Sequence, residues 1–148
     1  MMRRQVLVGL LLVGMAGVAG AADKAATALP PVAERGTNVQ VIAYYFHGTM
    51  RCETCLKIER QAREAIERRF AVEVAEKRLV FEPVNYDKPE NAHYLKDYKL
   101  PCPSLVLVRQ KDKQKWKLLG QTWEFVHIPP KLDLYIEEET SKFLEAAK

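Results

Sequence analysis

The sequence predicts an α/β domain in which a mixed sheet lies between helices on both of its faces. Segments with the composition of strands alternate with segments in which apolar residues recur every three or four positions. A helical segment joins the first two strands, which makes them parallel, whereas a short polar turn joins the last two, which makes them antiparallel. Helices that connect strands in this way pack on the faces of the sheet, so a three-layer arrangement follows.

Four strands are expected. The first is uncharged and rich in valine, isoleucine and aromatic residues, which is typical of a buried strand. The second contains Pro83, which indicates a bulge or a position at the edge of the sheet. The polar run 111–114 is the turn of a hairpin between the last two. The predicted strands are Val39–Phe46, Leu79–Tyr86, Leu105–Val108 and Trp116–Leu119.

Three helices complete the pattern. The first begins near Cys55 and is amphipathic, because its apolar residues fall at helical spacing and charged residues fill the opposite face. The second is short, begins near Pro89, and is predicted to turn Ala92, Leu95 and Tyr98 inward. The third runs from about Pro130 to Ala147. Its predicted buried residues are Leu132, Tyr135, Ile136, Phe143 and Leu144.

The N-terminus has the pattern of a secretory signal peptide over residues 1–21. A basic start at Arg3 and Arg4 is followed by an apolar stretch and then by small residues. A retained membrane anchor is the alternative, but the stretch is shorter than the ~20 apolar residues that a spanning helix needs. We therefore expect a cleaved signal, a flexible lead-in over residues 22–37, a domain over residues 38–148, and secretion across the inner membrane into the periplasm.

Charge and length narrow the functional classes. The chain has 23 Lys and Arg residues against 19 Asp and Glu residues, and cleavage would remove two arginines and leave a net charge of +2. This excess is too small to indicate binding to nucleic acid, or to a membrane surface once the signal is removed. About 127 residues would remain, which suits one domain with one core.

The most informative motif is Cys52-Glu53-Thr54-Cys55, which lies between the first strand and the first helix. A thiol at the start of a helix is close to free backbone N–H groups and to the positive end of the dipole, and both stabilise a thiolate. This placement predicts that Cys52 attacks a substrate disulfide and that Cys55 resolves the mixed disulfide. A plain structural bridge is the alternative, although so short a loop adds little stability.

The chain resembles the thioredoxin-like superfamily from Asn38 to its C-terminus. The Cys-x-x-Cys motif after the first strand carries this resemblance, together with the segment Leu100-Pro101-Cys102-Pro103-Ser104-Leu105. The resemblance implies that Pro103 is a cis-proline facing the active cysteines, and that the backbone at Cys102 can pair with a partner peptide. The implied partner is therefore a protein thiol or disulfide, or another redox protein.

The segment Tyr45–Glu59 is similar to small exported proteins known as ArsF-type nitrophenyl-compound nitroreductase subunits. Nitroreduction usually needs a flavin or a similar cofactor. The sequence has no glycine fingerprint for a flavin or a dinucleotide, so no cofactor is expected. Any part in nitroreduction would be that of an electron carrier.

The motif also departs from ordinary thioredoxin. Arg51 stands where tryptophan is usual, and Glu53-Thr54 replace Gly-Pro. Arg51 would favour the Cys52 thiolate, whereas Glu53 would oppose it. The buried acid common in the preceding strand has no counterpart within Val39–Phe46, so the direction of electron flow stays open.

Two alternatives involve the third cysteine. Cys102 is either an inert core residue or a third thiol near the pair. Together with Cys52, Cys55 and His47, Cys102 would supply three sulfurs and one imidazole, a ligand set that suits zinc or copper(I). The function classes left open are a thiol–disulfide oxidoreductase or electron-transfer protein, a metal-binding protein on the same fold, and a non-catalytic interaction domain.

Overall fold

The computed structural model describes residues 38–147, so the predicted signal peptide and lead-in lie outside the described residues. Strands and helices alternate as the apolar spacing predicts. The strands are β1 (Val41–His47), β2 (Leu79–Asn85), β3 (Ser104–Arg109) and β4 (Trp116–Leu118). The helices are α1 (Glu53–Arg69), α2 (Ala71–Ala75), η2 (Pro89–Asn91), α3 (Tyr94–Asp97), α4 (Thr122–Phe125) and α5 (Pro129–Glu145).

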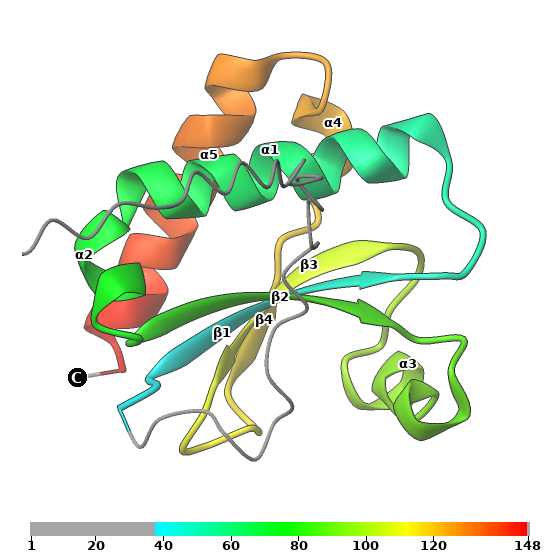
Figure 1. Cartoon of the computed structure of the whole chain (residues 1–148), viewed down its shortest axis with the longest axis horizontal. Helices are drawn as coiled ribbons and strands as arrows, with labels where there is room; N and C mark the ends of the chain where they lie inside the picture. Colours follow the sequence, from blue (N-terminus) through cyan, green and yellow to red (C-terminus); the bar gives the residue numbers. More distant parts are fainter. Residues whose placement is uncertain (1–37, 148) are drawn as a thin grey trace, which may run out of the picture.

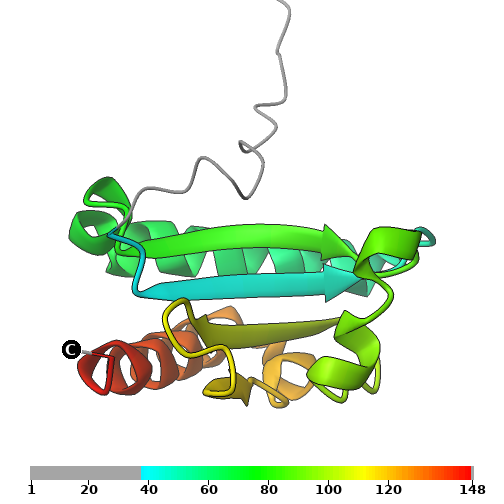
Figure 2. The same ribbon diagram turned by 90° about the horizontal axis from the view of Figure 1, so that it is seen from below.

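The strands described form one mixed sheet in the order β2-β1-β3-β4. β1 and β2 are parallel, and the pairs β1–β3 and β3–β4 are antiparallel, as the connections predicted. Figure 2 shows β1 and β2 side by side with their arrowheads at the same end. β2 is an edge strand, which accounts for Pro83 because an edge strand can lack one ladder N–H. This α/β arrangement is compatible with a thioredoxin-like fold.

Helices cover both faces of the sheet (Figure 1). α1 and α5 contact each other on one face, where alternate residues of β1 such as Val41 and Ala43 pack against Ile58 and Ile136. The opposite face carries a second core, in which Phe46 and Tyr98 pack with α3 and the loop after it. The two cores follow from the alternation of side chains along β1, which is buried on both sides.

The predicted boundaries are correct to within two residues for most elements, but the second helix differs. Ala92 is exposed and Leu95 is 41% exposed, so neither turns inward as predicted. Tyr98 is buried as predicted, and its inward neighbour is Tyr94, which lies one turn away and stacks on it at 5.7 Å between ring centroids. The short helices α2 and α4 were not predicted.

The final helix follows the prediction closely. Leu132, Ile136 and Leu144 are buried, and Tyr135 and Phe143 are partly buried against the same core. None of the helices within residues 38–147 is both long and apolar enough to cross a membrane.

Candidate functional site

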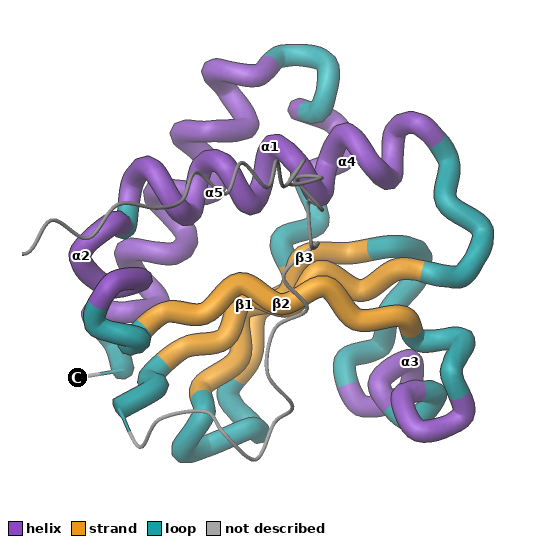
Figure 3. Tube along the Cα trace, in the orientation of Figure 1, coloured by secondary structure: helices purple, strands orange, loops and turns teal. Residues whose placement is uncertain are grey.

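The two cysteines of the motif form a disulfide at the junction of β1 and α1. Their Cα atoms are 5.1 Å apart. Figure 3 shows this junction as the loop that leaves β1 at the right and rises to the first turn of α1. The strand therefore delivers the motif to the end of the sheet, and the helix begins at Glu53.

Cys52 is the N-cap of α1. Its backbone is extended, with φ −75° and ψ 162°, and its Sγ accepts from the backbone N–H of Cys55 at 3.1 Å. An N-cap atom lies at the positive end of the helix dipole and next to unpaired N–H groups, so negative charge on this sulfur is stabilised. Cys52 is exposed, whereas Cys55 is only 5% exposed. A partner can therefore reach Cys52 far more easily than Cys55.

A hydrogen bond from the buried Tyr45 fixes the backbone of the motif. Its ring is completely buried in the core, and its hydroxyl donates to the carbonyl oxygen of Cys55 at 2.8 Å. Burial raises the pKa of Tyr45 above its ordinary value. The hydroxyl therefore stays protonated and keeps donating across the neutral pH range.

An ion-pair group lies beside the motif. The Arg51 guanidinium pairs with Glu59 on α1, and Arg63 pairs with the other oxygen of Glu59 at 3.2 Å. The Glu59 side chain is only 15% exposed. Glu59 therefore offsets part of the positive charge of Arg51, and the effect of Arg51 on Cys52 is weaker than the sequence alone indicated.

The loop between β1 and Cys52 is fastened to the loop after β2. The Thr49 N–H donates to Asp87 Oδ2 at 2.6 Å, and Asn85 Nδ2 donates to Thr49 Oγ1 at 3.1 Å. Gly48 is buried at this contact, and a Cβ there would lie 3.1 Å from Asp87 Oδ2. This close approach favours glycine and fixes the chain immediately before the motif.

Cys102 and Pro103 lie at the same end of the sheet. Ser104 pairs with Phe46 in the antiparallel register of β1 and β3, so the two residues before it lie beside the end of β1. Two side chains fasten this segment: Ser104 Oγ donates to the Cys102 carbonyl at 2.7 Å, and Trp123 Nε1 donates to the Pro103 carbonyl at 2.8 Å. The isomer of the Cys102–Pro103 bond stays a prediction.

The third cysteine is a free thiol of intermediate exposure, so it is not a fully buried core residue. Cys102 lies two residues before Ser104, which pairs with Phe46, so it lies at the end of the sheet where β1 leads to the motif. The fold therefore brings Cys102 to the neighbourhood of the disulfide.

The predicted metal ligands are not assembled in this disulfide form. His47 Nδ1 lies 2.9 Å from the Gly48 carbonyl oxygen, a contact in which the imidazole N–H donates. Within residues 38–147, no three His, Cys, Asp or Glu side chains are grouped closely enough to hold a metal ion.

The contributions of Tyr45 and Glu59 are not evident from the sequence motif. The position of Tyr45 could have been found from the strand period, which places it on the same face as Val41 and Ala43, towards α1. Glu59 follows Cys55 by four residues and so lies one turn along α1 on the same side. Its pairing with Arg51 depends on how the loop folds back, which the sequence pattern does not reveal.

No family model matches the chain, and no curated protein matches it significantly.

Proposed function

We propose that this chain is an exported thiol–disulfide oxidoreductase or electron-transfer protein that uses Cys52 and Cys55 as its redox pair. The observation that carries this proposal is the asymmetry of the disulfide. Cys52 is exposed and caps a helix of 17 residues, whereas Cys55 is buried one turn further in. A bridge with only a structural role requires neither the exposed sulfur nor its position at the helix N-terminus.

The exchange runs in two steps. In the reduced protein, the Cys52 thiolate attacks one sulfur of a substrate disulfide, forms a mixed disulfide, and releases the other substrate sulfur as a thiolate. The Cys55 thiolate then attacks Cys52 Sγ, which restores the internal disulfide and releases the second substrate thiolate. Two electrons pass from the protein to the substrate, and the same steps in reverse oxidise a dithiol.

Pro103 and the backbone of Cys102 would form the substrate-facing side of the site. Both lie beside the loop that leads to Cys52, and the Ser104 and Trp123 hydrogen bonds hold their carbonyl groups in place. An extended partner segment would pair with this backbone and present its cysteine to Cys52. The partner we propose is accordingly a protein thiol or disulfide, or another redox protein.

We base the proposal of export on the signal-like residues 1–21. We base the proposed membership of the thioredoxin-like superfamily on the Cys52–Cys55 motif and the segment around Pro103. The order of the sheet is compatible with a thioredoxin-like fold, and the similarity to small exported ArsF-type proteins rests on the segment Tyr45–Glu59 alone. Among those, this chain would act as an electron carrier, because catalysis of nitroreduction itself needs a cofactor.

The decisive experiment is a redox titration with the thiols trapped and located by mass spectrometry. We expect Cys52 and Cys55 to titrate as one two-electron couple between about −120 and −270 mV, the range of exchange proteins. A pair that stays oxidised below about −300 mV would behave as a structural bridge and would contradict the proposal.

A trapping experiment tests the roles of the two sulfurs. Cys55→Ser should accumulate mixed disulfides with a disulfide-containing peptide, because the resolving thiol is absent. Cys52→Ser is the matched control, with Cys102→Ser in both variants to remove the third thiol, and it should trap much less because the remaining Cys55 is buried. Equal trapping by both variants would refute the assignment of Cys52 as the nucleophile.

A further inference from the structure

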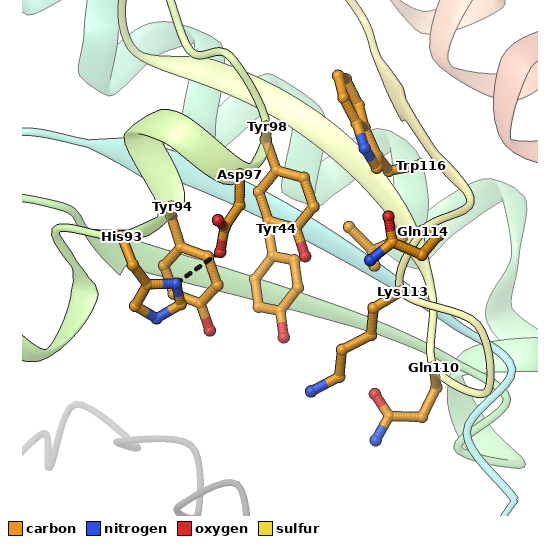
Figure 4. Close-up of a pocket in the computed structure, with 10 residues that line it drawn as sticks. Tyr44, His93, Tyr94, Asp97, Tyr98, Gln110, Lys113, Gln114 and Trp116 are labelled. Carbon is orange, nitrogen blue, oxygen red and sulfur yellow. Dashed lines mark hydrogen bonds and ion pairs between the residues drawn. The ribbon is translucent and has the colours of Figure 1, made fainter.

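A second concave surface lies on the face of the sheet opposite α1 and α5. It is a cavity of about 410 Å³ between β1, α3 and the β3–β4 hairpin, which we call the aromatic pocket. Its volume falls in the range of small-molecule sites. Figure 4 shows aromatic rings along one side of the pocket and polar side chains from the hairpin along the other.

The aromatic wall is a packed and therefore preorganised surface. Tyr94 and Tyr98 stack nearly parallel, with an angle of 11° between their planes, and Tyr44 lies 5.9 Å from the Tyr94 ring. Trp116 on β4 meets the Tyr98 ring edge-on at 5.6 Å. Because these rings come from three different elements and contact one another, a ligand would not have to order them on binding.

The opposite side of the pocket is polar and carries the Lys113 ammonium. Gln110 and Lys113 belong to the hairpin, whose turn is built by Asp112: its Oδ1 accepts from the Gln114 N–H at 3.2 Å. Within residues 38–147, Lys113 makes no ion pair. Figure 4 shows its side chain directed to the same opening as the Tyr44 ring.

The acidic group of the pocket is already engaged. The Asp97 carboxylate accepts from His93 Nδ1 at 2.7 Å, one helical turn away. A ligand cation would therefore compete with His93 for this carboxylate and would meet the Lys113 ammonium. A ligand anion would meet an ammonium and the amide N–H groups of Gln110 and Gln114.

From this juxtaposition we propose that the aromatic pocket binds a small planar aromatic carboxylate. The ring would pack against Tyr94 and Trp116, the partly exposed rings of the pocket, and the carboxylate would pair with Lys113. The site is separate from the Cys52–Cys55 pair, because it lies on the other face of the sheet and none of the three cysteines lines it. Binding would accordingly not require the redox activity.

A ligand series tests the charge preference. Sodium benzoate, benzyl alcohol and benzylamine should be titrated separately into the full chain and followed by NMR. We expect benzoate to shift the indole N–H signal of Trp116 but not that of Trp123, and to bind at least threefold more tightly than the other two compounds. Equal affinity for all three, or no benzoate binding at 10 mM, which is roughly the weak limit of a specific site, would overturn the proposal.

A matched pair of lysine variants tests the partner of the carboxylate. Lys113→Gln should weaken benzoate binding about three- to fivefold and leave benzyl alcohol unaffected, because only the ion pair is lost. Lys111→Gln is the control, since Lys111 is also exposed on the hairpin but does not line the pocket. Loss of benzoate affinity in both variants, or in neither, would exclude a specific role for Lys113.

Discussion

Residues next to the disulfide determine how easily each sulfur becomes a thiolate. Cys52 caps the N-terminus of α1 and follows Arg51 in the chain, and Glu59 offsets part of the arginine charge. The Glu59 carboxylate is mostly buried and binds two arginines. Its electrostatic effect is therefore stronger than that of a carboxylate in a typical surface ion pair. The reactivity of Cys52 therefore depends on a residue that is seven positions further along the chain.

Glu59→Gln should lower the pKa of the Cys52 thiol. Removing the carboxylate leaves more of the Arg51 charge free to stabilise the thiolate, and we expect the pKa of the Cys52 thiol to fall. The measurement is thiolate absorbance against pH in a Cys55→Ser background, where Cys102→Ser removes the third thiol. Glu64→Gln is the control, because Glu64 is exposed on α1. An unchanged or higher pKa in Glu59→Gln would mean that Arg51 does not act on Cys52.

At the scale of elements, α3 is joined to the sheet by aromatic rings and not by aliphatic side chains. Tyr98, at the C-terminal end of α3, contacts the rings of Phe46, Tyr94 and Trp116 and is only 5% exposed. Burial, with smaller contributions from Tyr44, Tyr94 and Asp97, raises the pKa of Tyr98 to about 12. The docking of α3 is consequently sensitive to alkaline pH.

The pKa of Tyr98 is higher in the folded chain than in the unfolded chain, where it is about 10. The folded state therefore binds the proton more tightly, and stability falls as the pH rises from about 10 to 12. Tyr98→Phe should unfold in urea with a smaller loss of stability between pH 9 and 11 than the parent. An identical pH dependence in the two proteins would show that ionisation of Tyr98 does not destabilise α3.

Sequence patterns predicted the long elements well and the short ones poorly. α1 and α5 each present a full apolar stripe over 17 residues, so their period is unmistakable. α3 has four residues, which is about one turn, and one turn cannot establish a helical period. Hydrophobicity predicts a buried Leu95, but the stacking of Tyr94 on Tyr98 decides which side of α3 faces the sheet.

The position of the candidate site was predictable for a different reason. Strand–helix order places Cys52 at the end of the sheet, and the antiparallel β3 brings Pro103 back to that end. The supporting contacts of Tyr45, Arg51 and Trp123 arise only when side chains from distant segments meet. They depend on loop conformation, which local spacing does not encode.

At the scale of the whole molecule, the two cores on opposite faces of the sheet carry most of the stability, and the disulfide adds little. The bridge closes a loop with a sequence separation of 3. By the loop-entropy argument such a short loop contributes no more than about 2 kcal/mol. The fold should therefore tolerate both redox states, as a protein that cycles between them requires.

Reduction should lower the melting temperature by no more than about 10 °C and leave the transition cooperative. The measurement is thermal unfolding followed by circular dichroism, with and without a phosphine reductant. The Cys52→Ser/Cys55→Ser double variant is the control, because it should melt like the reduced parent. A broad transition, or loss of folded structure on reduction, would indicate a structural bridge and contradict the proposed cycle.

The short separation of the paired cysteines also has a consequence for oxidative folding. Cys102 lies about fifty residues beyond Cys55, and in an unfolded chain the probability that two thiols meet falls as the loop between them lengthens. Cys52 and Cys55 should therefore find each other well before either meets Cys102, even while β3 is still unformed. Scrambled pairings would then be rare in the newly made protein, and the odd cysteine would not need a chaperone to keep it out of the wrong bond.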